Sequence, residues 1–171
     1  MSIITKKLSV KLSITIFLVL VVLFTTFVYM QNQNVKKASE YTIGSMNMKM
    51  AEAFTTQFDA AQYKSYLADP TENDQYWQIR KRLDQFRSEI GALYVYTVKI
   101  NEQKEPIILI DGQPTDSDSA SPIGELTDIP ADAINQLLQG QPAKTGILNN
   151  EDYGSYISSY VPIKDPSGKI G

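Results

Sequence analysis

The sequence predicts an α+β protein in which a transmembrane helix continues into a long helix, followed by an antiparallel sheet with flanking helices. Three observations lead to this fold class. An uncharged apolar run fills residues 12–30, a helical pattern without proline follows it, and the period of the pattern changes from 3.6 to 2 near Leu93. The 171 residues leave room for one domain beside the N-terminal segment.

The composition restricts the chemistry, because the chain has no cysteine and no histidine. Zinc sites built from these residues, thiolate nucleophiles and Ser-His-Asp triads are therefore excluded. We expect no enzymatic activity, no catalytic residue, no metal and no cofactor. The acidic residues of the long loop do not match the spacing of an EF-hand, so we interpret them as solvated; they are Asp116, Asp118, Glu125 and Asp128.

Charge is distributed unevenly along the chain. Residues 1–11 contain Lys6, Lys7 and Lys11, whereas all 19 acidic residues follow this segment. An acidic domain cannot offer the basic face that phosphate contacts need, so we expect no binding to nucleic acid.

Residues 12–30 are predicted to remain in a lipid bilayer. A helix of this length just crosses a hydrocarbon core of roughly 30 Å. A cleaved signal peptide is the alternative, but the apolar run is long and no small-x-small cleavage pattern follows it. Three lysines precede the span and two, Lys36 and Lys37, follow it. The positive-inside rule then predicts a single-pass protein of the cell membrane, with residues 1–11 cytoplasmic and the rest extracytoplasmic.

Residues 31–67 show small or apolar residues at steps of three and four, which predicts one long amphipathic helix. We interpret it as a stalk that forms a homodimer, with the first helix of a bundle as the alternative. Pro70 is predicted to begin the next helix with Asp69 as its cap, and Gly91 to end that helix after Ile90.

The rest of the domain, within residues 68–171, reads as two hairpins. Residues 93–98 and 106–111 are rich in β-branched and aromatic residues and flank a polar turn at 101–104. A long loop at 112–130 and a short helix at 130–140 precede a second predicted hairpin, with strands at 143–148 and 153–163. A further turn at 165–168 has no returning strand, so we expect the natural chain to continue into a last strand and a second membrane span.

This order of elements resembles the single Cache domain, the PAS-like extracytoplasmic sensor of bacterial chemoreceptors, histidine kinases and diguanylate cyclases. Three segments carry the resemblance: IGALYVY at 90–96, LIDG at 109–112 and YVPIKDPSGKIG at 160–171. The resemblance covers about residues 35–171. It implies a PAS-like sheet, a small-molecule ligand such as an amino acid or small organic acid, and a role in signal transduction, chemotaxis foremost.

In such a domain the ligand lies between the sheet and its covering loop. Tyr94 and Tyr96 share one predicted strand face, and Tyr156, Ser158 and Tyr160 share another. Their hydroxyls suit a mostly apolar pocket, although core or surface positions are the alternative. Two charged residues complete the candidate ligand-binding set. Asp111 either meets an ammonium group or ends the strand as a turn residue, and Arg80 either holds a carboxylate or pairs with Asp84 on the surface.

The predicted function is therefore ligand sensing by a transmembrane receptor, with a methyl-accepting chemotaxis protein as the first candidate. The sensor region of a histidine kinase or diguanylate cyclase is the closest alternative. A membrane-tethered hydrolase or a partner-binding ectodomain are alternatives of another class.

Overall fold

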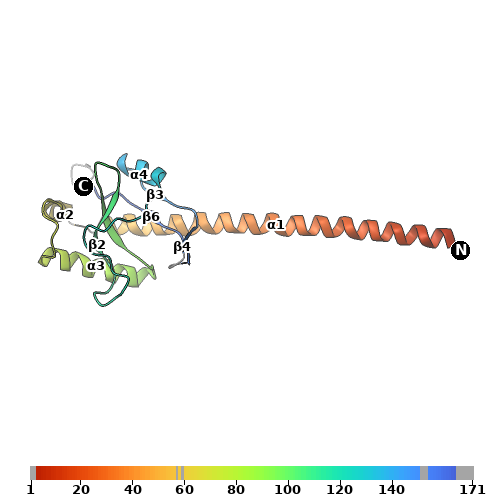
Figure 1. Cartoon of the computed structure of the whole chain (residues 1–171), viewed down its shortest axis with the longest axis horizontal. Coiled ribbons are helices and arrows are strands. Elements are labelled where there is room, and N and C mark those ends of the chain that lie inside the picture. Colours follow the sequence, from red (N-terminus) through yellow and green to blue (C-terminus); the bar gives the residue numbers. More distant parts are fainter. Residues whose placement is uncertain (1–2, 57, 59, 151–153, 165–171) are drawn as a thin grey trace. The chain divides into compact units, whose positions relative to one another are not determined.

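The computed structural model describes residues 3–56, 58, 60–150 and 154–164. The chain divides into two compact units, residues 1–43 and residues 44–171, which are considered separately below. Figure 1 shows a mixture of helices and small antiparallel sheets, which confirms the coarse fold class expected from the sequence.

Helix α1 runs from Ile3 to Thr55 and contains the predicted apolar span. Its large apolar side chains between Leu8 and Met30 are exposed, and no part of its most apolar stretch is buried. The polar members of the span bond to the backbone of their own helix: Thr15 donates to the Lys11 carbonyl and Thr26 to the Val22 carbonyl. Within the described residues, α1 is the one helix long and apolar enough to cross a membrane, and a signal sequence has the same length and composition.

The helix predicted to continue to about residue 67 ends at Thr55, so this prediction is wrong. The Thr55 hydroxyl donates to the Glu52 carbonyl and the Thr56 hydroxyl to the Ala53 carbonyl. Such side-chain bonds to the backbone compete with the continuation of a helix. A separate short helix, α2, spans Ala60–Ala68. It buries Tyr63 and Tyr66 in the core.

Helix α3 spans Asp74–Ile90, and its start also differs from the prediction. Asn73 caps it by accepting a hydrogen bond from the Tyr76 backbone amide at 3.0 Å, four residues beyond the expected Asp69 cap. Its end is as predicted, because Gly91 adopts the left-handed conformation with φ 67°. Tyr76, Ile79 and Leu83 form the buried stripe of this helix.

Strands β1 (Tyr96–Ile100) and β2 (Pro106–Asp111) form an antiparallel hairpin. The turn between them is the predicted one, closed by the Lys104 amide on the Asn101 carbonyl at 3.0 Å. The bounds of β2 agree with the sequence, but β1 begins three residues later than expected and leaves Leu93 exposed. A bulge between Thr97 and Val98 shifts the register along the hairpin.

The second predicted hairpin is broken into four short strands. Helix α4 (Ala131–Leu138) precedes β3 (Ala143–Lys144) and β4 (Leu148–Asn150). Strand β5 (Gly154–Tyr156) pairs with β4, and β6 (Ser159–Tyr160) pairs with β3. Residues 149 and 150 of the expected turn at 149–152 belong instead to β4, and its other two residues lie outside the described part of the chain. The expected turn at 165–168 lies wholly outside it.

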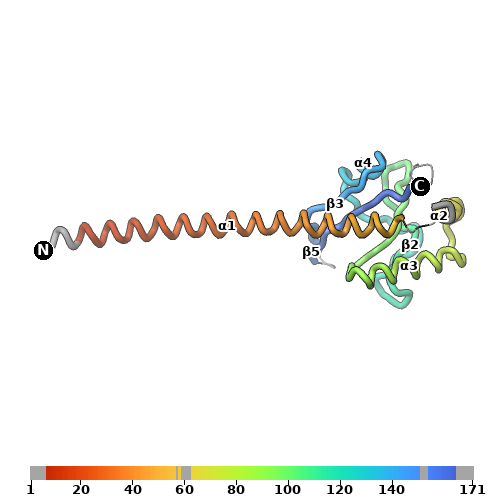
Figure 2. Tube along the Cα trace, turned by 180° about the vertical axis from the view of Figure 1, so that it is seen from behind, coloured from red at the N-terminus to blue at the C-terminus, as the bar shows by residue number. Residues whose placement is uncertain are grey.

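Two hydrophobic clusters lie on opposite sides of the strands, which run between α3 and α4 in Figures 1 and 2. The first joins α2 and α3 to Leu109 and Ile110 of β2. The second joins α4 to Ala143 of β3, with side chains of β1 and Tyr160 packed against it. The first cluster thus holds β2 against α2 and α3, and the second holds β3, with side chains of β1 and β6, against α4.

The end of β2 approaches α3 more closely than any side chain would allow. A Cβ atom built on Gly112 would lie 2.7 Å from the Val95 carbonyl oxygen and 2.8 Å from the Leu83 Cβ. The Gly112 amide donates to that same Val95 carbonyl at 2.9 Å. Glycine is therefore required here by space and not by backbone conformation.

We predict that Gly112→Ala lowers the free energy of unfolding by about 3 kcal/mol, because backbone atoms must separate to admit the methyl group. The control is Gly91→Ala, where the left-handed backbone is strained but open space surrounds the site, with an expected cost of about 1 kcal/mol. Urea unfolding of both variants measures the difference. Equal costs would mean that the contact at Gly112 is not tight.

Candidate functional site

Three tyrosines from three different strands converge; we call Tyr96, Tyr156 and Tyr160 the tyrosine cluster. All three side chains are half-buried. Burial raises the pKa of the Tyr96 hydroxyl, because the phenolate would lose its hydration, and the nearby Tyr160 raises it further. The Tyr96 hydroxyl also forms a hydrogen-bonding interaction with Thr127, near the end of the long loop, and this interaction lowers its pKa.

Tyr160 occupies the other side of the cluster. Burial again raises the pKa of its hydroxyl, while a hydrogen-bonding interaction with Ser158 lowers it. Asp128 is close enough to raise this pKa through its negative charge. Tyr96 and Tyr160 therefore stay neutral at physiological pH and present hydroxyls that both donate and accept hydrogen bonds.

Two hydrogen bonds with Thr145 hold Ser158 beside the cluster, between β5 and β6. The Ser158 amide donates to the Thr145 Oγ1 at 3.0 Å, and the Thr145 amide donates to the Ser158 carbonyl at 2.9 Å. The next residue, Ser159, donates from its hydroxyl to the Gly44 carbonyl of α1 at 2.9 Å. The cluster is thus one residue away from a direct contact with the last part of α1.

Asp111 is the cross-strand partner of Tyr96 at the end of β2. Its side chain is 2% exposed and accepts two hydrogen bonds, from the Gln113 amide at 3.0 Å and the Ser121 amide at 2.8 Å. Burial raises the pKa of this carboxyl, and the two amides and the charges of Arg80 and Arg87 oppose that rise. Asp111 therefore makes the expected turn with Gln113, and its role toward an ammonium group stays a prediction.

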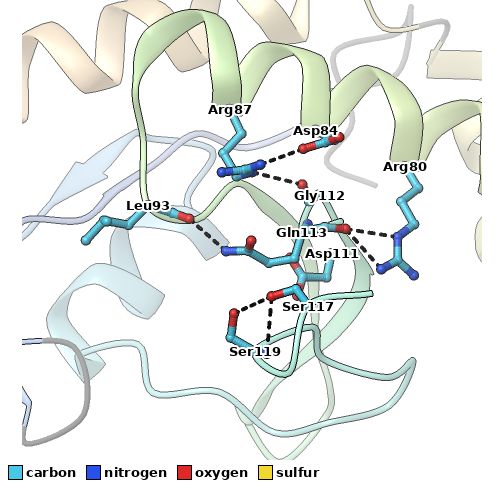
Figure 3. Close-up of polar contacts among 9 residues, drawn as sticks. All are labelled: Arg80, Asp84, Arg87, Leu93, Asp111, Gly112, Gln113, Ser117 and Ser119. Carbon is cyan, nitrogen blue, oxygen red and sulfur yellow. Dashed lines mark hydrogen bonds and ion pairs between the residues drawn. The ribbon is translucent and has the colours of Figure 1, made fainter. Parts of the chain in front are cut away.

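Arg80 and Arg87 extend from α3 to two consecutive carbonyls after β2, as Figure 3 shows. Arg80 donates from Nε and Nη2 to the Gln113 carbonyl at 3.3 and 3.0 Å, and Arg87 donates from Nε to the Gly112 carbonyl at 3.1 Å. The predicted surface pair of Arg80 with Asp84 does not form. Asp84 instead pairs with Arg87 at 2.7 Å, because Arg80 is buried on the face of α3 that packs against β2.

The guanidinium of Arg80 is held by polar and aromatic groups. Its Nη1 donates to the Tyr76 hydroxyl at 3.0 Å, and its central carbon lies 5.4 Å from the centre of the Trp77 ring. In the part of the chain that the structure describes, no carboxylate lies within ion-pair distance of Arg80. The charge of Asp111 acts on it across the intervening residue.

Gln113 is that intervening residue. Its amide donates to Asp111, its carbonyl accepts from Arg80, and its side-chain Nε2 donates to the Leu93 carbonyl at 2.7 Å. Two buried opposite charges are therefore bridged by the backbone of one residue. Figure 3 shows this bridge beside the hydrogen-bonded Ser117 and Ser119 of the loop.

The structure brings together most, but not all, of the residues singled out in the sequence. Tyr96, Tyr156 and Ser158 meet at the tyrosine cluster, and Asp111 is the cross-strand partner of Tyr96. Arg80 belongs to the network on α3. Tyr94 precedes β1 and is half-buried there, so the strand face that it was expected to share with Tyr96 does not extend to it.

Sequence reasoning missed Gln113 and Thr127. Neither carries a recognisable signal, because a single glutamine or threonine in a polar loop is ordinary. The dipeptide Asp111-Gly112 at the end of an apolar strand was visible, and the importance of the following residue depends on tertiary contacts.

No family model, no curated protein and no solved structure matches this chain. Its own geometry is therefore the basis for any functional argument. Among the side chains within the described ranges, no three acidic residues come close enough to hold a metal ion. The chemistry on offer is hydrogen bonding by hydroxyls and a carboxylate, next to aromatic surface.

Asp111 gives a testable dependence of stability on pH. Because its carboxyl pKa is higher in the folded protein than the ordinary 3.8, the folded state keeps the proton to higher pH than the unfolded chain does. Its contribution to the free energy of unfolding is then fully present below pH 3.8 and is lost as the pH rises through the raised pKa.

We predict that wild-type protein becomes more stable relative to Asp111→Asn as the pH falls through this window, since asparagine does not titrate. Thermal unfolding of both proteins between pH 3.5 and 7 measures the difference and removes the effect of the other carboxylates. A difference that grows in the opposite direction would show that hydrogen bonding outweighs burial at Asp111.

Proposed function

We propose that this chain is the ligand-sensing region of a transmembrane receptor, with a PAS-like domain of the single Cache type outside the cytoplasm. The observation that carries the proposal is the convergence of Tyr96, Tyr156 and Tyr160 from three strands, with Ser158 beside them and Asp111 as the cross-strand partner of Tyr96. Half-buried hydroxyls beside aromatic rings are the polar groups that small-molecule sites use for orientation.

The surroundings of the cluster support the same role. The loop at 112–130 contributes Thr127 and Asp128 on one side and Ser121 on the other. Long loops that pack at the edge of a sheet commonly carry binding residues, because the sheet positions them while the loop supplies variety. A small molecule with its own donors and acceptors, such as an amino acid or a small organic acid, is the proposed ligand.

The link to signalling rests on α1. Within the domain, its last turns contact the strands of the site: Lys144 of β3 donates to the Ser45 hydroxyl at 2.6 Å, and Ser159 of β6 donates to the Gly44 carbonyl. Phe54 also stacks on Phe86 of α3, with 4.2 Å between ring centres. A ligand that favours one arrangement of β6 would act on this helix directly.

We further propose that residues 12–30 anchor the protein in the cell membrane with a cytoplasmic N-terminus, and that the helix forms a homodimer. The exposed apolar surface of the span and its self-bonded threonines support the anchor, because backbone and hydroxyl groups must be satisfied internally in lipid. A chemotaxis receptor is the foremost setting, and a histidine kinase or diguanylate cyclase would use the same sensor.

We predict that the full chain in lipid nanodiscs binds one class of a panel of amino acids, small carboxylic acids and amines, detected as a rise in melting temperature. Tyr96→Phe and Tyr160→Phe should each weaken that binding about tenfold, since each loses one hydroxyl bond to the ligand.

The matched control is Tyr63→Phe, which removes a buried hydroxyl that lies in the first cluster and makes no hydrogen bond of good geometry. It should leave affinity unchanged. A panel without any stabilising compound, or equal losses in all three variants, would contradict the proposal.

A further inference from the structure

The long loop is attached to the domain at both of its ends. At its start, the Gly112 amide bonds to the Val95 carbonyl at 2.9 Å and Arg80 holds the Gln113 carbonyl at 3.0 Å. At its far end, the Gly124 amide donates to the Ile108 carbonyl at 2.9 Å and the Ile108 amide donates to the Glu125 carbonyl at 2.8 Å. Both ends of the loop are therefore bonded to the backbone of the β1–β2 hairpin or of the residue that precedes it.

The middle of the loop, residues 114–122, is held differently. Most of its hydrogen bonds join residues of the segment to one another: the Ser117 amide donates to the Pro114 carbonyl and the Ala120 amide to the Ser117 carbonyl, both at 3.1 Å. Its last residue, Pro122, accepts from the Glu125 amide. Across the described part of the chain, one hydrogen bond joins this segment to the strands: the Ser121 amide on the Asp111 carboxylate at 2.8 Å. None of its side chains is fully buried.

We propose that residues 114–122 form a strap that opens and closes as one unit, with the Asp111 carboxylate as its latch. The opening leaves the ends of the loop in place, because α3 and the sheet hold them independently. Breaking one bond frees nine residues with little loss of buried apolar surface, which is the condition for a local opening of low free energy.

The latch connects the strap to the candidate site. Asp111 is the cross-strand partner of Tyr96, so the group that holds the strap closed lies opposite a member of the tyrosine cluster. A ligand that donates a hydrogen bond to this carboxylate competes with the Ser121 amide and opens the strap. This regulatory role rests on the proposed function, whereas the opening itself does not.

Amide hydrogen exchange of the full chain in nanodiscs, without any ligand, tests the strap. In Asp111→Asn, the side-chain oxygen can still accept from Gln113, but an NH2 group then faces the Ser121 amide. We expect exchange at Ser121 and Ala120 to become at least tenfold faster, with the amides of Gly112 and Gly124 unchanged. Ser121→Ala keeps the backbone donor and serves as the control, with exchange as in wild type.

Ser121→Pro removes the donor itself and provides a second route should the buried substitution prevent folding. It should accelerate exchange at Ser117 while Gly112 and Gly124 stay protected. Unchanged exchange within 114–122 in both variants, or an equal acceleration at Gly112 and Gly124, would overturn the strap. A failed ligand screen would leave this result standing, and a failed strap would leave ligand binding standing.

Discussion

The close contact between the end of β2 and helix α3 is the constraint on which the rest of the domain depends. At Gly112 the backbone lies so near Leu83 that no side chain fits between them. Two arginines of α3 then reach the carbonyls of Gly112 and Gln113, which fixes the direction in which the chain leaves the sheet. A helix and a strand end are joined here by both packing and charge-assisted hydrogen bonds, the stronger kind.

This junction determines where the polar groups of the candidate site can lie. Because Gln113 is held by Arg80, its amide is fixed in position for Asp111, and Asp111 is fixed opposite Tyr96. A buried charge without a direct partner is costly, so the bridge through Gln113 offsets part of the desolvation of both charges. The second hydrophobic cluster does the equivalent for Tyr160, which packs against α4 and β3. The candidate site is thus attached to both hydrophobic clusters, and the loop that we propose to open lies beside it.

The sequence predicted those features that depend on local patterns. The apolar span, the stop at Gly91, the bounds of β2 and the loop after it follow from hydrophobic period and turn residues, and each is present. The end of α1 and the start of α3 were placed wrongly, because Thr55 and Asn73 act through side-chain bonds to the backbone that compete with proline and aspartate signals nearby. The second hairpin was predicted as two long strands, but its pairing is divided between β3, β4, β5 and β6.

The candidate site shows the same division. Tyr96, Tyr156 and Ser158 were singled out because alternation along a predicted strand places side chains on one face, although the structure places Ser158 between β5 and β6. Arg80 was a candidate either for holding a carboxylate or for a surface pair with Asp84, since a spacing of four residues cannot reveal which face of α3 is buried. Gln113 was invisible because its role comes from three partners that lie at least two and up to 33 positions away in the chain.

A double-mutant cycle between Arg80→Met and Asp111→Asn tests the central claim, that these two buried charges act as a pair through Gln113. Free energies of unfolding of the two single variants and the double variant give the coupling energy, and the same cycle with Arg87→Met measures the background from charge alone. We predict a coupling of about 1 kcal/mol or more for Arg80 and a clearly smaller one for Arg87. Additive effects for Arg80, or equal couplings for the two arginines, would contradict the account.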